Sequence, residues 1–287
     1  MSFITRVLYG VLIGVASIAP GLSGGTIAIA LGFYEHLINA IADLLKHFRK
    51  NFLYLLPYGI GGLASVACLS VAINYLFIHY PLPTNTLFIG FIIGTLPFIW
   101  AKLKSHQGEK GLRFSHVLTA GFFFLIVLIP VFAKGAGSGS ASLSAGPLSM
   151  MILVGIGMIA ATTLVVPGLS GTMILTSLGY YKPLLSIAST FVTAAFSLDF
   201  PAAARQLIFI VPLGVGVVIG VFLTAKFVQF LFKKIPSHVY SAIAGLIAAT
   251  PVVMLADVER SAFSPLNIGL SAVTLLVGLF LTRKLGE

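Results

Sequence analysis

Two short stretches place proline, glycine and hydroxyl side chains inside segments that are otherwise apolar. The first break reads PGLSGGT over residues 20–26, and the second break reads PGLSGT over residues 167–172. Proline ends an incoming helix, and glycine lets the backbone turn and a ligand approach closely. The helix that follows each break begins with free N–H groups and the positive end of its dipole. The chemistry predicted for these stretches is therefore the binding of an anion such as a phosphate or a carboxylate.

The residues expected to bind the anion come from both breaks. They are Ser23, Gly24, Gly25, Thr26, Ser170, Gly171 and Thr172. For a single Pro-Gly pair the plainer explanation is helix packing, because small residues let membrane helices cross tightly. The recurrence of Pro20–Gly24 as Pro167–Gly171 favours a binding site instead.

Few ionisable side chains lie near the breaks. Glu35 follows the first break by about two helical turns, with His36 beside it. Ionisable residues at membrane depth are costly and are commonly functional. Glu35 is a candidate for proton coupling or an ion pair, with an interfacial position as the alternative. Arg205 is a candidate head-group contact, with an interfacial anchor as the alternative. No metal-ligand constellation, cofactor motif or catalytic set is indicated.

The elements that position these residues are predicted from composition. Of the 287 residues, 58% are hydrophobic and only 8% are charged, whereas soluble domains carry about 25% charged residues. Apolar stretches such as 52–78 and 117–132 contain no charged residue, which favours membrane helices over an alternating barrel. The chain is predicted to be an all-α polytopic membrane protein, and Cys68, its one cysteine, is expected to pack as a small hydrophobe.

The similarity of the two breaks extends along the chain. Gly32 and Tyr34 correspond to Gly179 and Tyr181, and further proline and glycine positions also match. We expect a first repeat over residues 1–134, a Gly/Ser-rich linker over 135–147, and a second repeat over 148–287. Each repeat is predicted to contain a broken helix pair followed by three spans. The pairs cover about 3–45 and 149–190, and the spans about 52–78, 85–103, 113–132, 206–232, 239–256 and 265–282.

Three spans are an odd number, so the second repeat is expected to be inverted relative to the first. With the N-terminus in the cytoplasm, only four basic positions face outward: Lys134, Lys182, Arg205 and Arg260. The remaining Lys and Arg residues face the cytoplasm, which agrees with the positive-inside rule. The net charge of +10 is thus explained by cytoplasmic loops rather than by nucleic-acid binding. Whether each broken pair spans or re-enters the bilayer is left open.

The doubled motif carries a family resemblance. Residues 20–26 with Gly32-x-Tyr34-Glu35, and 167–171 with Gly179-x-Tyr181, resemble the DUF368 family of bacterial and archaeal membrane proteins. The resemblance covers essentially the whole chain. It implies a flippase of the cytoplasmic (inner) membrane that recycles undecaprenyl phosphate from the outer to the inner leaflet. A cradle of donors that opens sideways would carry the phosphate head while the polyprenyl tail stays in lipid.

Two other functions are compatible with parts of this pattern. The first is transport of a small soluble anion such as phosphate, for which the same cradle would serve. The second is an enzyme similar to undecaprenyl-diphosphate phosphatases, whose related motif continues with Arg-Ser. Here Gly24 and Gly171 follow the motif serines, and no Asp or Glu precedes Glu35. The carboxylates and cation that hydrolysis needs are missing from the motif, so the chain is not expected to be an enzyme. The coupling ion and the oligomeric state are left open.

Overall fold

The computed structural model describes residues 1–18, 23–106, 112–132, 143, 146–256 and 258–286. Every regular element in this part of the chain is a helix, as predicted. The first half contains α1 (Phe3–Ile18), α2 (Gly24–Ala30), α3 (Tyr34–Ala42), α4 (Phe48–His79), α5 (Pro81–Ser105) and α6 (Phe114–Phe132). The second half contains α7 (Pro147–Val165), α8 (Gly171–Ser177), α9 (Tyr181–Phe196), α10 (Phe200–Lys234), α11 (Pro236–Ala256), the short 3₁₀ helix η2 (Arg260–Ala262) and α12 (Pro265–Gly286).

Six helices of the described chain are long and apolar enough to cross a membrane, namely α4, α5, α7, α10, α11 and α12. A helix needs about 20 apolar residues to cross the hydrocarbon core. The predicted spans coincide with α4–α6 and α10–α12 to within a few residues. The prediction of a multi-pass helical membrane protein is confirmed. Residues Pro20, Gly21 and Leu22, and most of the predicted linker, lie outside the described residues.

Each predicted broken pair consists of three helices rather than two. Gly32 and Gly179 have φ values of +73° and +77°, the left-handed conformation that glycine adopts readily. The N–H of Phe33 donates to the carbonyl of Ala28 at 3.0 Å, and that of Tyr180 donates to Leu175 at 2.9 Å. These are Schellman motifs, in which a glycine ends a helix and the next residue satisfies a free carbonyl. The same signal therefore ends α2 and α8.

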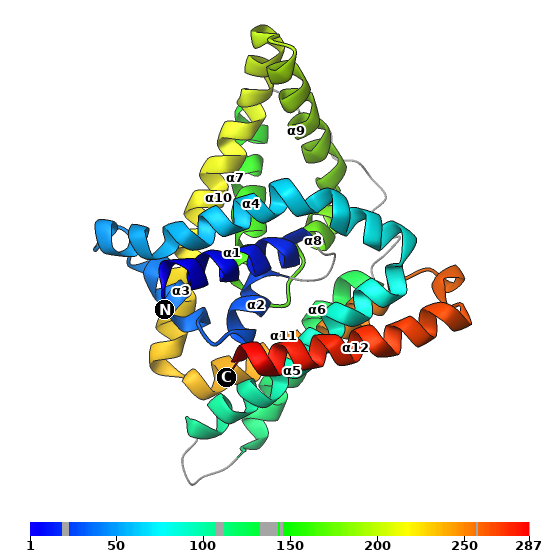
Figure 1. The fold of residues 1–287 in the computed structure, drawn as a ribbon. Helices are drawn as coiled ribbons and strands as arrows, with labels where there is room; N and C mark the ends of the chain where they lie inside the picture. Colours follow the sequence, from blue (N-terminus) through cyan, green and yellow to red (C-terminus); the bar gives the residue numbers. More distant parts are fainter. Residues whose placement is uncertain (19–22, 107–111, 133–142, 144–145, 257, 287) are drawn as a thin grey trace.

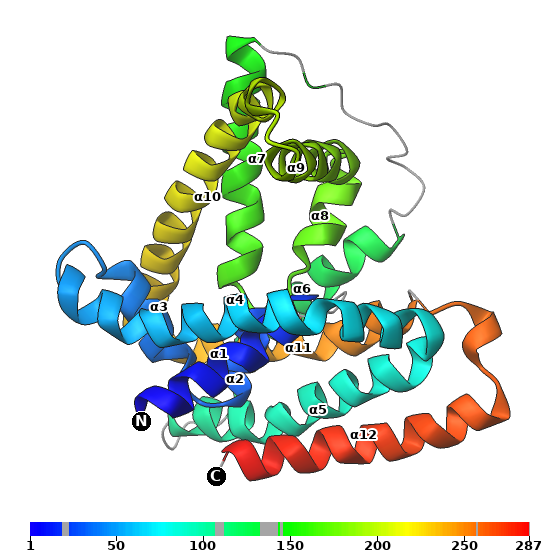
Figure 2. The same cartoon turned by 45° about the horizontal axis from the view of Figure 1, so that its top comes forward.

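The two halves interlock (Figures 1 and 2). Within the halves, α1 packs along α4 and α7 packs along α10. Between the halves, α5 packs along α12, α6 along α11, and α5 also contacts α11. Close approach depends on matched glycines. A Cβ on Gly61 would lie 2.0 Å from the Val7 carbonyl oxygen, and one on Gly216 would lie 2.1 Å from that of Val154. Any larger residue would force these helix pairs apart.

The short helices after the two breaks lie in different surroundings. Helix α2 is buried from Gly25 to Ala30 and contacts α5 and α7 near the middle of the molecule. Helix α8 has no buried residue among its described side chains and contacts α6, α7 and α9. Together α7, α9 and α10 project away from the other helices, toward the top of Figures 1 and 2. The repeated sequence is thus buried in one half and largely exposed in the other.

Candidate functional site

The two breaks meet through a shared hydrogen bond. The backbone N–H of Gly168 donates to both Ser23 Oγ at 3.1 Å and Thr26 Oγ1 at 3.2 Å. The two hydroxyls also lie 3.2 Å apart. Ser23 is 5% exposed and Thr26 is 0% exposed, so this contact is closed to water. The structure thus brings two predicted site residues of the first break against the backbone of the second.

Two close contacts hold Gly168 and its neighbours in place. Gly168 has a φ of +78°, and a Cβ there would lie 2.9 Å from the Leu246 carbonyl oxygen, so a larger residue is excluded. A Cβ on Gly25 would lie 3.2 Å from the carbonyl oxygen of Val165, the last residue of α7. The Tyr34 hydroxyl donates to that same carbonyl at 3.0 Å. Helix ends leave carbonyls without partners, and here the first half supplies one for the second.

The remaining predicted binding residues lie apart from this contact. Gly24 and Gly171 face the helices that precede them, because added Cβ atoms would lie 2.7 Å from Ile13 Cγ2 and from Thr163 Oγ1. Ser170 Oγ and Thr172 Oγ1 hydrogen bond to each other at 2.9 Å, and Thr172 is exposed. The described structure therefore gives the two glycines packing contacts, and it leaves the hydroxyls of the second break at the surface.

The ionisable residues predicted as candidates, Glu35 and Arg205, also lie on different helices. Glu35 accepts a hydrogen bond from the Tyr240 hydroxyl of α11 and lines a cavity of about 50 Å³ with His36, Phe98 and Lys102. Arg205 is exposed near the start of α10. Toward the other end of α10, Gln229 donates to Asp43 Oδ2 at 2.9 Å. That bond, together with Lys46 and Lys233, holds the pKa of Asp43 below its usual range.

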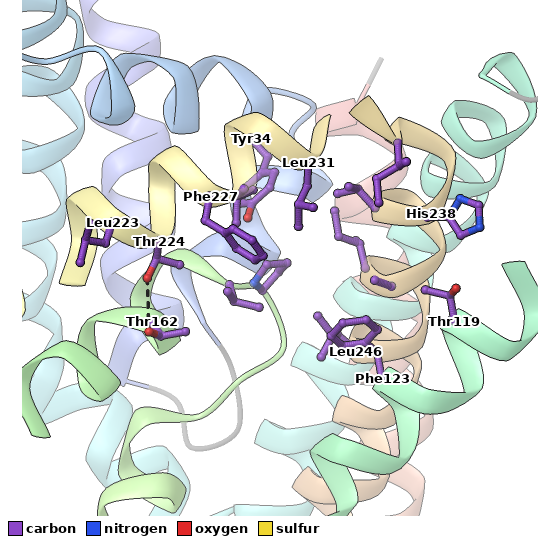
Figure 3. A pocket seen from close by; sticks show the side chains of 17 residues that line it. Tyr34, Thr119, Phe123, Thr162, Leu223, Thr224, Phe227, Leu231, His238 and Leu246 are labelled. Carbon is purple, nitrogen blue, oxygen red and sulfur yellow. Dashed lines mark hydrogen bonds between the residues drawn. The ribbon is translucent and has the colours of Figure 1, made fainter. Parts of the chain in front are cut away.

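A larger cavity of about 570 Å³ opens beside the meeting point of the breaks (Figure 3). We call it the lateral cavity. Apolar side chains form most of its wall, and most of the lining residues lie on α10 and α11. Val166 and Pro167 reach it from the second break, and Tyr34 reaches it from the first half. The Thr162 and Thr224 hydroxyls meet at 3.3 Å on one side, and Thr119 and His238 lie on the other.

The family resemblance implied a sideways opening, but of the wall residues the sequence marked only Tyr34 and Pro167, which belong to the doubled motif. Most of the others lie on α10 and α11, and each of these two helices alone reads as an ordinary apolar span. In the sequence, His238 reads only as a polar residue at the end of a span. Its ring packs against that of His116 with centroids 4.4 Å apart, a contact between residues far apart in the sequence. Within each span, no periodic pattern marks either histidine.

Fold and site together define a multi-pass helical membrane protein in which an apolar cavity adjoins two broken helices. Such a cavity accommodates an apolar chain, and the breaks supply hydrogen-bond donors beside it. Comparison with known proteins identifies the family. The chain belongs to the VCA0040-like family of undecaprenyl phosphate translocase-like proteins, whose model matches residues 13–200 and 187–284.

Two curated relatives are both named polyprenyl-phosphate transporter. The protein from Vibrio cholerae is 27% identical over 268 residues, covering 87% of this chain and 77% of its own. The protein from Staphylococcus aureus is 26% identical over 286 residues, covering 98% of this chain and 95% of its own. No solved structure matches the chain significantly. The predicted family resemblance is confirmed, as is the prediction of a transporter rather than an enzyme.

Proposed function

We propose that this chain moves undecaprenyl phosphate, or a closely similar polyprenyl phosphate, from the outer to the inner leaflet of the cytoplasmic membrane. The observation that carries the proposal is the lateral cavity, because an apolar wall beside backbone and hydroxyl donors suits an amphiphile. A small soluble anion would gain little from such a wall. Membership of a transporter family whose curated relatives are named for polyprenyl phosphate supports the same substrate.

The phosphate head binds where the breaks meet. Phosphate oxygens accept hydrogen bonds, and the Gly168 N–H and the hydroxyls of Ser23 and Thr26 converge at one point. A hydroxyl hydrogen rotates to suit its partner, so all three groups can donate to one phosphate. In the structure described above, these three groups form hydrogen bonds with one another instead. Transport therefore requires the breaks to separate, after which Ser170, Gly171 and Thr172 approach the head from the second half.

The two halves form inverted repeats with the N-terminus in the cytoplasm. The equivalent pairing of α1 with α4 and α7 with α10 supports this arrangement. Helix ends expected in the cytoplasm also lie together, as the contacts of His116 with His238 and of His106 with Tyr240 illustrate. Cysteine labelling of intact cells tests it in a Cys68→Ser background. A cysteine at Ser261 should react with an impermeant reagent from outside, and one at Ser105 only after permeabilisation. Reaction of both from the same side would contradict the inversion.

Transport itself is tested in liposomes that carry undecaprenyl phosphate in the outer leaflet. An impermeant phosphatase is added at intervals, and lipid that has moved inward is protected from it. Liposomes with the protein should protect the lipid faster than empty liposomes, and excess inorganic phosphate should not slow the process. Equal rates with and without protein would refute lipid transport, and strong competition by inorganic phosphate would favour the soluble-anion alternative.

A further inference from the structure

Two histidines lie at one end of the lateral cavity and take no part in the contact between the two breaks. His238 of α11 lines the cavity, and its ring packs against that of His116 of α6. His116 lies on the same face of α6 as Thr119 and Phe123, which both line the cavity, because residues three and seven apart share a helix face. The histidine pair is therefore part of the cavity end formed by α6 and α11.

One nitrogen of this pair has no hydrogen-bond partner among the residues that the structure describes. His116 is 5% exposed, and its Nδ1 accepts a hydrogen bond from the Arg113 backbone N–H at 3.2 Å. Nε2 therefore carries the hydrogen in the neutral ring. Within the described residues, Nε2 is buried and has no hydrogen-bond partner. A buried donor without a partner is unfavourable, so this position is suited to an acceptor that is not part of the chain.

Positive charge gathers at the same end. Arg113 lies one turn before His116, and Lys233 and Lys234 end α10 just before Ile235, which lines the cavity. We call Arg113, His116 and His238 the basic mouth. An apolar cavity with a basic mouth is complementary to a lipid with a single anionic head. Inorganic phosphate would match the mouth but not the wall, and a neutral lipid would match the wall but not the mouth.

We propose that the basic mouth is a second phosphate site, at which a polyprenyl phosphate enters or leaves the protein with its tail in the lateral cavity. The inference rests on the proposed substrate and adds a site apart from the breaks. His116 Nε2–H and the His238 ring donate to the phosphate, and Arg113 contributes charge. Because Val166 and Pro167 line the same cavity, the head can pass from this mouth to the breaks while the tail stays within one apolar space.

The test is lipid binding to the purified full-length chain in detergent, followed by native mass spectrometry. The probes are undecaprenyl phosphate, undecaprenol and inorganic phosphate. The His116→Gln/His238→Gln double variant should bind undecaprenyl phosphate about ten-fold more weakly, the loss expected for one charged hydrogen bond. Its binding of undecaprenol should not change. His238→Arg puts a different hydrogen-bond donor at this position and should retain binding. His79→Gln removes an exposed histidine outside the cavity and is the matched control.

The tail is tested by Ala242→Phe, which places a ring in the cavity wall and should weaken the binding of both lipids. Unchanged binding of undecaprenyl phosphate by the double variant would overturn the site, as would an equal loss for undecaprenol, which would mean that the histidines only pack. Binding of inorganic phosphate as tight as that of the lipid phosphate would also overturn it. A wild-type chain that binds neither lipid would overturn the proposed function and, with it, this site.

Discussion

The two breaks share five residues yet differ in almost everything around them. Ser23 and Thr26 are buried against Gly168, whereas Thr172, in the place of Gly25, is exposed. Helix α3 crosses to α10 of the other half, but α9 stays with α10 of its own. The shared residues therefore specify the turn, and the helices packed around each turn specify its environment. We interpret the difference as one conformation of a transporter whose two halves exchange roles during the cycle.

The strongest test of the meeting point is Gly168→Ala. A non-glycine residue in the left-handed region costs about 1–2 kcal/mol. The added Cβ would also lie 2.9 Å from the Leu246 carbonyl oxygen, and overpacking of this kind costs about 1–3 kcal/mol. The variant should show a clear fall in melting temperature in detergent and lose transport. A melting temperature equal to that of the wild type would mean that the second break does not need this turn.

Exchanging residue types between the breaks tests their asymmetry. Gly25→Thr should destabilise the protein by about 1–3 kcal/mol, because the side chain would press on Val165 and Pro167. Thr172→Gly, the reverse change at the equivalent exposed position, should cost less than about 1 kcal/mol. Denaturant unfolding of both variants in detergent measures the difference. Similar losses would show that the two breaks have similar environments, contrary to the comparison.

A smaller effect is expected from the two matched tyrosines. Tyr34→Phe removes the hydroxyl that donates to the Val165 carbonyl and should cost about 0.5–1.5 kcal/mol, the net contribution of a typical hydrogen bond. Tyr181→Phe, at the start of α9, should change stability by less than about 0.5 kcal/mol. Thermal unfolding of both variants in detergent measures the difference in stability. A Tyr181 variant as destabilised as the Tyr34 variant would place both tyrosines in equivalent contacts.

The smallest change in stability is expected at Glu35 and at Lys182, which occupies the position equivalent to Glu35 after the second break. Glu35→Gln should barely alter stability, because the amide oxygen can still accept from Tyr240. We expect the variant to bind lipid phosphate but to lose the response of transport to a pH gradient, since it cannot gain or release a proton. Lys182→Gln should respond as the wild type does. Transport in liposomes with and without a gradient measures this, and a normal response of Glu35→Gln would leave Glu35 a structural role only.

Local signals in the sequence predicted much of the fold. Apolar length indicated the spans, and proline with glycine indicated both breaks. The third helix of each broken segment was missed, although Gly32 and Gly179 carried the signal, because a glycine beside an aromatic residue was interpreted only as a mark of the repeat. A duplicated sequence also predicts equal environments, and it could not indicate which break is buried. Tyr34 with Val165 and His116 with His238 are contacts between distant segments, and such contacts are set by tertiary packing rather than by local pattern.

The interlocking of the halves has a consequence for biosynthesis. Helices α5 and α6 rest on α12 and α11, which are synthesised after them. The first half therefore leaves the ribosome without the surfaces that cover its final two helices. These helices stay in the bilayer without their partners until α11 and α12 are inserted. Until then, close-packed positions such as Gly90, which contacts Leu275 of α12, are exposed to lipid or to other chains. A chain truncated before α12 would keep that vulnerable state permanently and become a substrate for membrane quality control.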